Sequence, residues 1–242
     1  MLIHGWGLNS GVWQSVIPEL VEFARITTID LPGFGLNSTV LPDDYSLVNI
    51  VELISQTLPD NSVLVGWSLG GLVAQSIAIE QPERLSGLVT VASTPCFAQK
   101  TDWHGIKPEV LNAFEAQLEH DFAKTLARFL AIQALGSPSA KADIKLIQQQ
   151  VQAFPDPSHV ALMDGLALLS SVDLRESIAR IMCPTLRLYG RLDSLVPYDV
   201  IAQIQQLQPN AHYDVVPHAA HAPFISHRQL WVEKLQQFIQ SI

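Results

Sequence analysis

The sequence predicts an α/β protein with a mainly parallel β-sheet, helices on both faces of the sheet and one inserted helical segment. Short β-branched runs alternate with helical patterns along most of the chain, which is typical of parallel strands joined by helices. Between residues 95 and 172 the strand signal is absent, and apolar residues recur at helical spacing. The chain has 242 residues, of which 48% are hydrophobic, and this is enough for one large core.

Six strands are expected in the regular part of the chain. The first ends at His4, and the others cover residues 26–30, 62–66, 87–92, 185–190 and 213–216. Helical spacing in the inserted segment is set by Val110, Phe114, Leu118, Phe122, Leu126, Phe129 and Leu130. A turn is expected inside the segment at residues 155–157, Pro-Asp-Pro. We therefore predict a core of residues 1–94 and 173–242, and a helical cap of residues 95–172 over the active site.

The stretch Gly66–Trp67–Ser68–Leu69–Gly70 lies between an expected strand and an apolar helical pattern over residues 72–79. A strand, a tight G-x-S-x-G turn and a helix form a nucleophile elbow, in which the strained serine projects its Oγ. Glycine at positions 66 and 70 lets the strand and the helix approach closely. A glycine-rich turn with an incidental serine is the alternative, but the strand and helix around it favour Ser68 as a nucleophile.

A serine nucleophile needs a histidine base and an acid that orients the base. In serine hydrolases with this elbow, the acid and then the base follow the serine, on loops after late strands. Asp193 follows the expected strand at 185–190, and both His218 and His221 follow the last strand. Spacing alone does not separate the two histidines. The apolar run Ala219–Ala222 favours His221, because an imidazole there is desolvated and held.

The first strand leads into His4–Gly5–Trp6–Gly7, an HG-x-G turn of the kind that supplies an oxyanion amide. We expect the oxyanion hole to consist of the amides of Trp6 and of Leu69, the residue after the nucleophile. His4 is expected to make local hydrogen bonds rather than to transfer protons. The remaining histidines lie in polar or loop contexts and are expected to be solvated; they are His104, His120, His159, His212 and His227.

Composition excludes several classes of function. The formal net charge of −9 argues against a nucleic-acid partner, whose phosphates require a basic face. Residues 61–79 carry no charge, but their glycines, their serines and the elbow argue against a membrane span. Cys96 and Cys183 suit buried thiols in a reducing compartment and have no metal-ligand neighbours in the sequence. With no secretory signal visible at the start, we expect a cytoplasmic protein, and a monomer.

Seven segments together resemble the pimeloyl-[acyl-carrier protein] methyl ester carboxylesterases of biotin synthesis, a family of the α/β-hydrolase superfamily. They are HGWGLN at 4–9, DLPGFG at 30–35, GWSLGGLVA at 66–74, VASTPCF at 91–97, RFLAIQ at 128–133, LRLYGRLDSLVP at 186–197 and AHAPFISH at 220–227. The resemblance covers nearly the whole chain. The motifs HG-x-G and G-x-S-x-G identify only the superfamily. The segments GWSLGG, VASTPCF and AHAPFISH are much more specific to this one family. The chain departs from the superfamily pattern in having no strand before the one that ends at His4, which bears on stability rather than chemistry.

The resemblance implies an α/β-hydrolase fold and a catalytic triad of Ser68, Asp193 and His221, which decides against His218. It implies hydrolysis of the methyl ester of pimeloyl-acyl carrier protein, with release of methanol and without a metal or organic cofactor. The residues that it assigns to substrate binding are Trp6, Ser68, Leu69, Phe129, Leu130, Ala131, Ile132, Gln133 and His221.

One part of the expected cap is positively charged, although the chain as a whole is acidic. Between residues 122 and 149 it carries the cations Lys124, Arg128, Lys141 and Lys145 against Asp143 alone. Like charges at i and i+4 on a helix repel, so stability does not explain the two pairs. A solvated face is the alternative. The resemblance favours docking of the acidic acyl carrier protein on these four residues.

Two other functions fit the sequence. A serine hydrolase of the same fold can act on another bond, as a short-chain carboxylesterase, a thioesterase or a carbon–carbon hydrolase, because fold and triad do not fix the substrate. A non-catalytic member could bind a small ligand beneath the cap. The intact set of Ser68, Asp193 and His221 speaks against the non-catalytic alternative.

Overall fold

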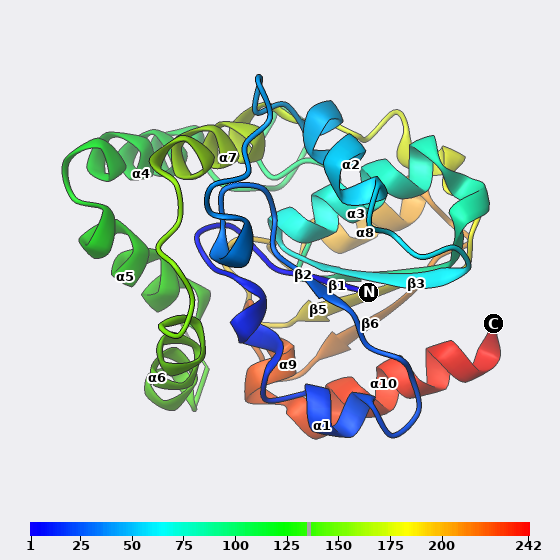
Figure 1. Cartoon of the computed structure of the whole chain (residues 1–242). Coiled ribbons are helices and arrows are strands. Elements are labelled where there is room, and N and C mark those ends of the chain that lie inside the picture. The colour runs from blue at the N-terminus through cyan, green and yellow to red at the C-terminus, as the bar shows by residue number, and fades with distance from the viewer. Residues whose placement is uncertain (135–136) are drawn as a thin grey trace.

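The computed structural model describes residues 1–134 and 137–242. Six strands form one sheet in the order β2-β1-β3-β4-β5-β6, and all five neighbouring pairs are parallel (Figure 1). The strands are β1 (Leu2–Ile3), β2 (Thr28–Ile29), β3 (Ser62–Trp67), β4 (Leu85–Val91), β5 (Thr185–Gly190) and β6 (His212–Val216). The parallel sheet predicted from the alternating pattern is confirmed, although β2 is shorter than the expected 26–30.

Helices cover both faces of this sheet. In Figure 1, α2, α3 and α8 lie above the sheet, and α1, α9 and α10 lie below it. Successive β4 residues point to opposite faces, so that Leu88 packs in the cluster under α3 and Val89 in the cluster with α10. The bounds are α1 (Ile17–Leu20), α2 (Leu47–Ser55), α3 (Leu69–Glu80), α8 (Val200–Leu207), α9 (Pro223–Ser226) and α10 (Arg228–Ser241). Short 3₁₀ helices cover Ser10–Trp13, Gly35–Asn37, Pro82–Arg84 and Ile178–Arg180.

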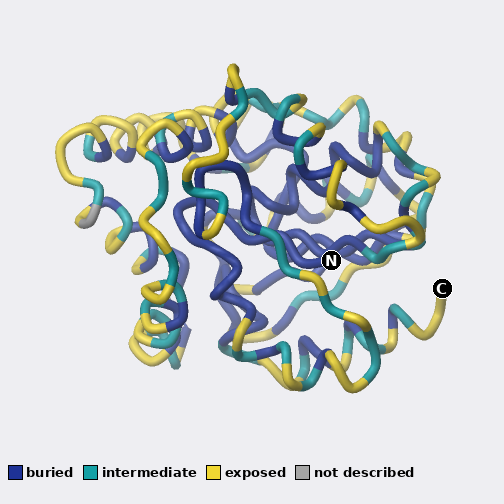
Figure 2. The backbone as a smooth tube through the Cα atoms, in the orientation of Figure 1, coloured by how far each residue is buried: buried dark blue, intermediate teal, exposed yellow. Residues whose placement is uncertain are grey.

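Four helices lie between β4 and β5 in the chain, and they pack to one side of the sheet (Figure 1). They are α4 (Pro108–His120), α5 (Phe122–Gln133), α6 (Ala140–Val151) and α7 (His159–Ser171). We refer to these helices as the inserted helices. Figure 2 shows that their outward turns are exposed, whereas the chain between them and the sheet is buried.

The apolar spacing over residues 110–130 runs through two of these helices rather than one. The break is at Asp121, whose extended backbone ends α4 and whose carboxylate accepts a hydrogen bond from the Lys124 amide at 3.0 Å, capping α5. Val110 is exposed, and its neighbour Leu111 is buried instead. The described helices include none that is both long and apolar enough to cross a membrane.

Candidate active site

Ser68 stands at the end of β3 in a backbone conformation that few L-residues adopt, with φ 54° and ψ −118°. The turn is too tight for side chains at its glycines. A Cβ on Gly66 would lie 2.3 Å from the Gly70 carbonyl oxygen, and one on Gly70 would lie 2.4 Å from the His4 carbonyl oxygen. Ser93 Oγ donates a hydrogen bond to the Ser68 carbonyl at 2.8 Å, which holds the strained turn. The strand–turn–helix predicted from the motif is therefore present.

His221 and Asp193 come together from two loops that follow β6 and β5. Their Nδ1 and Oδ2 atoms are 2.8 Å apart, and both residues are buried. The other carboxylate oxygen of Asp193 accepts hydrogen bonds from the amides of Leu195 at 2.8 Å and Val196 at 3.1 Å. With the Nδ1 proton donated to Asp193, the imidazole has its lone pair on Nε2. This Nε2 is buried and has no hydrogen-bond partner among residues 1–134 and 137–242.

The loop that carries His221 is fixed from both sides. The His221 carbonyl oxygen accepts a hydrogen bond from Trp67 Nε1 at 2.8 Å, and the His221 amide donates one to the Gln133 carbonyl at 2.9 Å. Trp67 belongs to the core and Gln133 to α5, so the base loop is held between the sheet and the inserted helices. His218 is exposed and lies on the outer side of the loop with a positive φ of 61°. The geometry thus favours His221 over His218 as a base.

Of the two expected oxyanion residues, Leu69 follows Ser68 in the chain, and Trp6 follows Gly5, which packs against Ser68. A Cβ on Gly5, the residue before Trp6, would be 3.1 Å from Ser68 Cβ. Leu69 opens α3, so its amide is among the first-turn N–H groups that have no partner within the helix. Such amides attract a developing negative charge.

His4 is buried beneath this loop and makes the local hydrogen bonds that the sequence analysis expected. Its Nδ1 donates to the Gly5 carbonyl at 2.7 Å, and its Nε2 accepts from the Leu31 amide at 2.9 Å. The Asp30 carboxylate nearby accepts from the amides of Ser10 and Leu36. Burial lowers the pKa of His4 below its usual 6.5, and the charge of Asp30 opposes this shift only in part. His4 is therefore neutral and holds the turn.

We expect His4→Ala to destabilise the protein by about 2–4 kcal/mol, because the Leu31 amide and the Gly5 carbonyl would both lose buried partners. The pH dependence should change as well. Since the pKa of His4 is lower in the folded state, its neutral form stabilises the fold fully above pH 6.5, and this contribution falls as the pH drops below 6.5. Urea unfolding from pH 5 to 8 measures both effects. A variant that retains the full decline below pH 6.5 would contradict this assignment.

The residues expected to bind substrate in the inserted helices occupy different positions. Phe129 is buried and packs edge-on against Trp6, with ring centroids 4.8 Å apart. Leu130 and Gln133 are buried beside the His221 loop, and both line a small crevice with Ala220 and Ala222.

The other two members of that segment are less enclosed. Ile132 is half-buried, and its carbonyl accepts a hydrogen bond from Ser194 Oγ at 3.4 Å. Ala131 is exposed. The structure thus places Phe129 against Trp6, and Leu130 and Gln133 against the loop that carries His221, whereas Ala131 is exposed.

The four cations lie on α5 and α6, and all are exposed. Arg128 donates to Gln117 Oε1 at 3.0 Å and lies over the Phe114 ring, 5.4 Å from its centroid. The ion pairs found in the described part of the chain include none of the four. Asp143, the one acid of this region, is buried and accepts from Ser139 Oγ at 2.8 Å. The exposed charge of α5 and α6 around these residues is therefore positive.

Sequence reasoning missed the residues that hold the site from behind. Trp67 was visible only as part of the elbow motif, and Asp30 only as part of a matching segment. Their hydrogen bonds join positions far apart in the chain, and no local pattern reports such contacts. Within the described residues, His, Cys, Asp and Glu side chains form no group of three or more able to hold a metal ion.

Comparison with known proteins agrees with the geometry. The family model for the alpha/beta hydrolase fold matches residues 1–228. The pimeloyl-[acyl-carrier protein] methyl ester esterase of Pseudoalteromonas atlantica is 47% identical over 230 residues, which are 95% of this chain and 89% of that protein. The protein of the same name from Aeromonas salmonicida is 47% identical over 239 residues, 99% of this chain and 94% of its own.

Among solved structures, an esterase from Exiguobacterium antarcticum superposes with a TM-score of 0.87 at 21% identity, covering 99% of this chain and 91% of its own. A bromoperoxidase from Bacillus anthracis also gives a TM-score of 0.87, at 23% identity and 99% and 90% coverage. These structural matches at low identity establish the fold alone, whereas the relatives at 47% identity identify the family within that fold. The chain therefore belongs to the α/β-hydrolase fold family and, within it, to the pimeloyl-[acyl-carrier protein] methyl ester esterases.

Proposed function

We propose that this protein is a serine carboxylesterase of biotin synthesis that hydrolyses the methyl ester of pimeloyl-acyl carrier protein, releasing methanol and leaving the pimeloyl carboxylate on the carrier. The observation that carries the proposal is the buried His221–Asp193 pair, 2.8 Å apart, in which the His221 loop is hydrogen-bonded to Trp67, the residue before a serine in elbow geometry. The substrate is taken from the names of relatives that are 47% identical over nearly the whole chain. No metal or organic cofactor is needed for this reaction.

In the proposed mechanism His221 Nε2 removes the proton of Ser68 Oγ, which attacks the ester carbonyl. The amides of Trp6 and Leu69 stabilise the oxyanion of the tetrahedral intermediate. The protonated His221 gives its proton to the methoxy oxygen, so that methanol leaves and the acyl group remains on Ser68. His221 then deprotonates a water molecule, which releases the acid and restores the serine. Asp193 stays ionised and stabilises the imidazolium.

We further propose that residues 95–172 act as a cap over a core of residues 1–94 and 173–242. Three contacts support this division: Trp6 Nε1 to the Leu162 carbonyl at 2.9 Å, Trp6 to the Phe129 ring, and the His221 amide to the Gln133 carbonyl. Each joins an inserted helix to a catalytic loop. The acyl chain would pass between them, along the segment Phe129–Gln133, where the resemblance places substrate contacts. We also propose that the enzyme works as a cytoplasmic monomer, which analytical ultracentrifugation and fractionation would test.

The acyl carrier protein is proposed to dock on Lys124, Arg128, Lys141 and Lys145. The support is electrostatic: four exposed cations stand on a chain whose net charge is −9, and Asp143, the one acid between residues 122 and 149, is buried. Complementary charges of this kind speed encounter more than they strengthen the final complex.

We expect Lys141→Glu combined with Lys145→Glu to lower kcat/KM for the carrier-bound substrate by about tenfold or more, while a small free methyl ester is hydrolysed normally. Raising ionic strength should reproduce the loss in the parent protein, because exposed charges are screened beyond about 8 Å at ~0.15 M salt. Both substrates are measured side by side across a salt series. Arg25→Glu with Arg180→Glu, two exposed cations outside the inserted helices, is the matched control. Parallel losses for both substrates would exclude docking.

Mass spectrometry of the products tests the main proposal. Carrier-bound pimeloyl methyl ester should lose 14 mass units, about one CH₂, while the carrier stays acylated. A thioesterase would instead free the carrier thiol and leave the methyl ester on the released acid. Labelling of Ser68 by a fluorophosphonate distinguishes the methyl esterase and the thioesterase from a non-catalytic protein, which would not react.

A further inference from the structure

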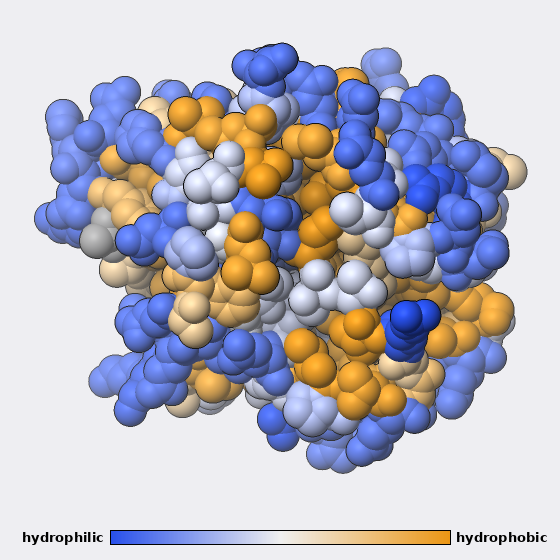
Figure 3. All heavy atoms as spheres, viewed as in Figure 1, coloured by the Kyte–Doolittle hydropathy of each residue, from blue (hydrophilic) through white to orange (hydrophobic). Residues whose placement is uncertain are grey.

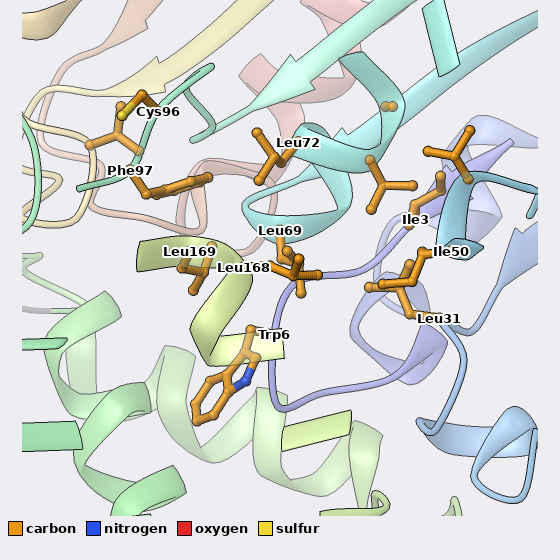
Figure 4. Packing of buried hydrophobic residues seen from close by; sticks show 14 of the residues in the cluster. Ile3, Trp6, Leu31, Ile50, Leu69, Leu72, Cys96, Phe97, Leu168 and Leu169 are labelled. Carbon is orange, nitrogen blue, oxygen red and sulfur yellow. The ribbon is translucent and has the colours of Figure 1, made fainter. Parts of the chain in front are cut away.

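The side chain of Trp6 is anchored by the inserted helices and not by its own loop. Its Nε1 donates a hydrogen bond to the Leu162 carbonyl of α7 at 2.9 Å, and its ring packs edge-on against Phe129 of α5. The indole is fully buried. In Figure 4, Trp6 and Leu69 lie beside the segment of α7 that carries Leu168 and Leu169.

The turn around Trp6 is restrained by a hydrogen bond, which His4 Nδ1 donates to the Gly5 carbonyl at 2.7 Å, and otherwise consists of glycines. Gly5 precedes Trp6 and Gly7 follows it, and Gly7 has a positive φ of 76°. Glycine is the residue with the widest choice of backbone conformations. The amide nitrogen of Trp6 is three bonds from its indole ring, so the position of the indole restrains that amide together with the His4 hydrogen bond to the Gly5 carbonyl.

Gly165 of α7 lies directly against the Trp6 indole. A Cβ at that position would be 3.0 Å from Trp6 Cδ1, 3.4 Å from Trp6 Nε1 and 3.7 Å from Leu69 Cδ2. Position 165 is three residues after Leu162 and therefore faces the same way on the helix. It is the one glycine in the α7 sequence, in a helix where alanine would be the better helix former.

We propose that Gly165, together with the Leu162 carbonyl, is a positioning residue for the oxyanion hole: it leaves room for the Trp6 indole, which with the His4–Gly5 hydrogen bond sets where the Trp6 amide points. The inference rests on the proposed esterase function, because the Trp6 amide matters only where an oxyanion forms. In this inference, α7 not only covers the substrate but also positions an amide of the oxyanion hole.

The test compares Gly165→Ala and Trp6→Phe with the parent enzyme on a short free methyl ester. Gly165→Ala should push the indole and lower kcat about tenfold to a hundredfold, with KM within about twofold, because an oxyanion donor acts on the transition state. Trp6→Phe should also lower kcat, because it keeps an aromatic ring but loses the hydrogen bond to Leu162. Circular dichroism and thermal melting confirm that each variant is folded.

Inhibitor affinity supplies a readout that a merely structural role would not change. A trifluoromethyl ketone analogue forms a hemiketal with Ser68 and places an oxyanion in the hole, whereas the matching methyl ether has no carbonyl. Gly165→Ala should weaken the ketone by the same factor as kcat/KM and leave the ether unaffected. Gly87→Ala is the control for a glycine replaced elsewhere, because its Cβ would contact Ile242 Cδ1 at 2.7 Å and Phe238 Cε1 at 3.2 Å rather than any residue of the site. It should lower the melting temperature without changing kcat.

Two results would overturn the inference: a folded Gly165→Ala enzyme with the parent kcat and ketone affinity, or a Trp6→Phe enzyme with the parent kcat. If Gly165→Ala does not fold, Trp6→Phe decides alone. A parent protein that hydrolyses no ester and does not react with the ketone would refute the proposed function, and this inference with it. An active parent with an unaffected Gly165→Ala variant would refute only the inference.

Discussion

Ser68→Ala is expected to reduce hydrolysis of the methyl ester by roughly 10⁶-fold, and His221→Ala by a similar factor. The two effects should not add, because the serine and the histidine act as one unit and either loss removes the covalent route. Steady-state kinetics on the free methyl ester measure kcat for each single variant and for the double variant. What activity remains should come from binding and the oxyanion hole alone.

His218→Ala is the control for this prediction. His218 lies on the same loop but is exposed, whereas His221 is buried and 2.8 Å from Asp193. We expect His218→Ala to keep most of the activity. Equal losses at His218 and His221 would contradict the assignment of the base.

Asp193→Asn is expected to lower kcat by about 10⁴-fold while leaving the fold intact. The asparagine oxygen can keep the hydrogen bonds from the amides of Leu195 and Val196, so that its NH₂ group turns toward His221 Nδ1. Nδ1 must then accept, which moves the imidazole proton to Nε2, where it blocks proton transfer from Ser68. Kinetics together with the rate of fluorophosphonate labelling measure the loss.

A matched control lies in the same stretch of chain. Asp199→Asn removes an exposed carboxylate six residues later and should leave turnover unchanged. Turnover near the parent level in Asp193→Asn would show that another acid orients the base. A loss of stability rather than of kcat would assign Asp193 to its loop instead of to the reaction.

The parts of the fold that could be predicted from the sequence are those set by local chemistry. Strand β5 was predicted residue for residue at 185–190, because a short run rich in leucine and tyrosine between Pro184 and the turn at Arg191 is recognised from its own pattern. The elbow was predicted from five residues, since only glycine fits where a Cβ would lie 2.3 Å from a carbonyl oxygen. The break between α4 and α5 was not seen, because the apolar spacing continues past Asp121 while the backbone does not.

The sequence alone therefore determined the order of the elements, the elbow turn, and the choice of Ser68 and Asp193 as the proposed nucleophile and acid, because each depends on residues close together in the chain. Spacing allowed both His218 and His221, and the family resemblance favoured His221; the tertiary structure gives the physical reason, because the packed loop buries His221 and brings its Nδ1 to 2.8 Å from Asp193. The tertiary structure decided that Trp6 is held by Leu162, a contact between residues 156 positions apart. A hydrogen bond of that range has no local signal, because it forms only after the inserted helices have packed onto the carboxyl ends of the strands.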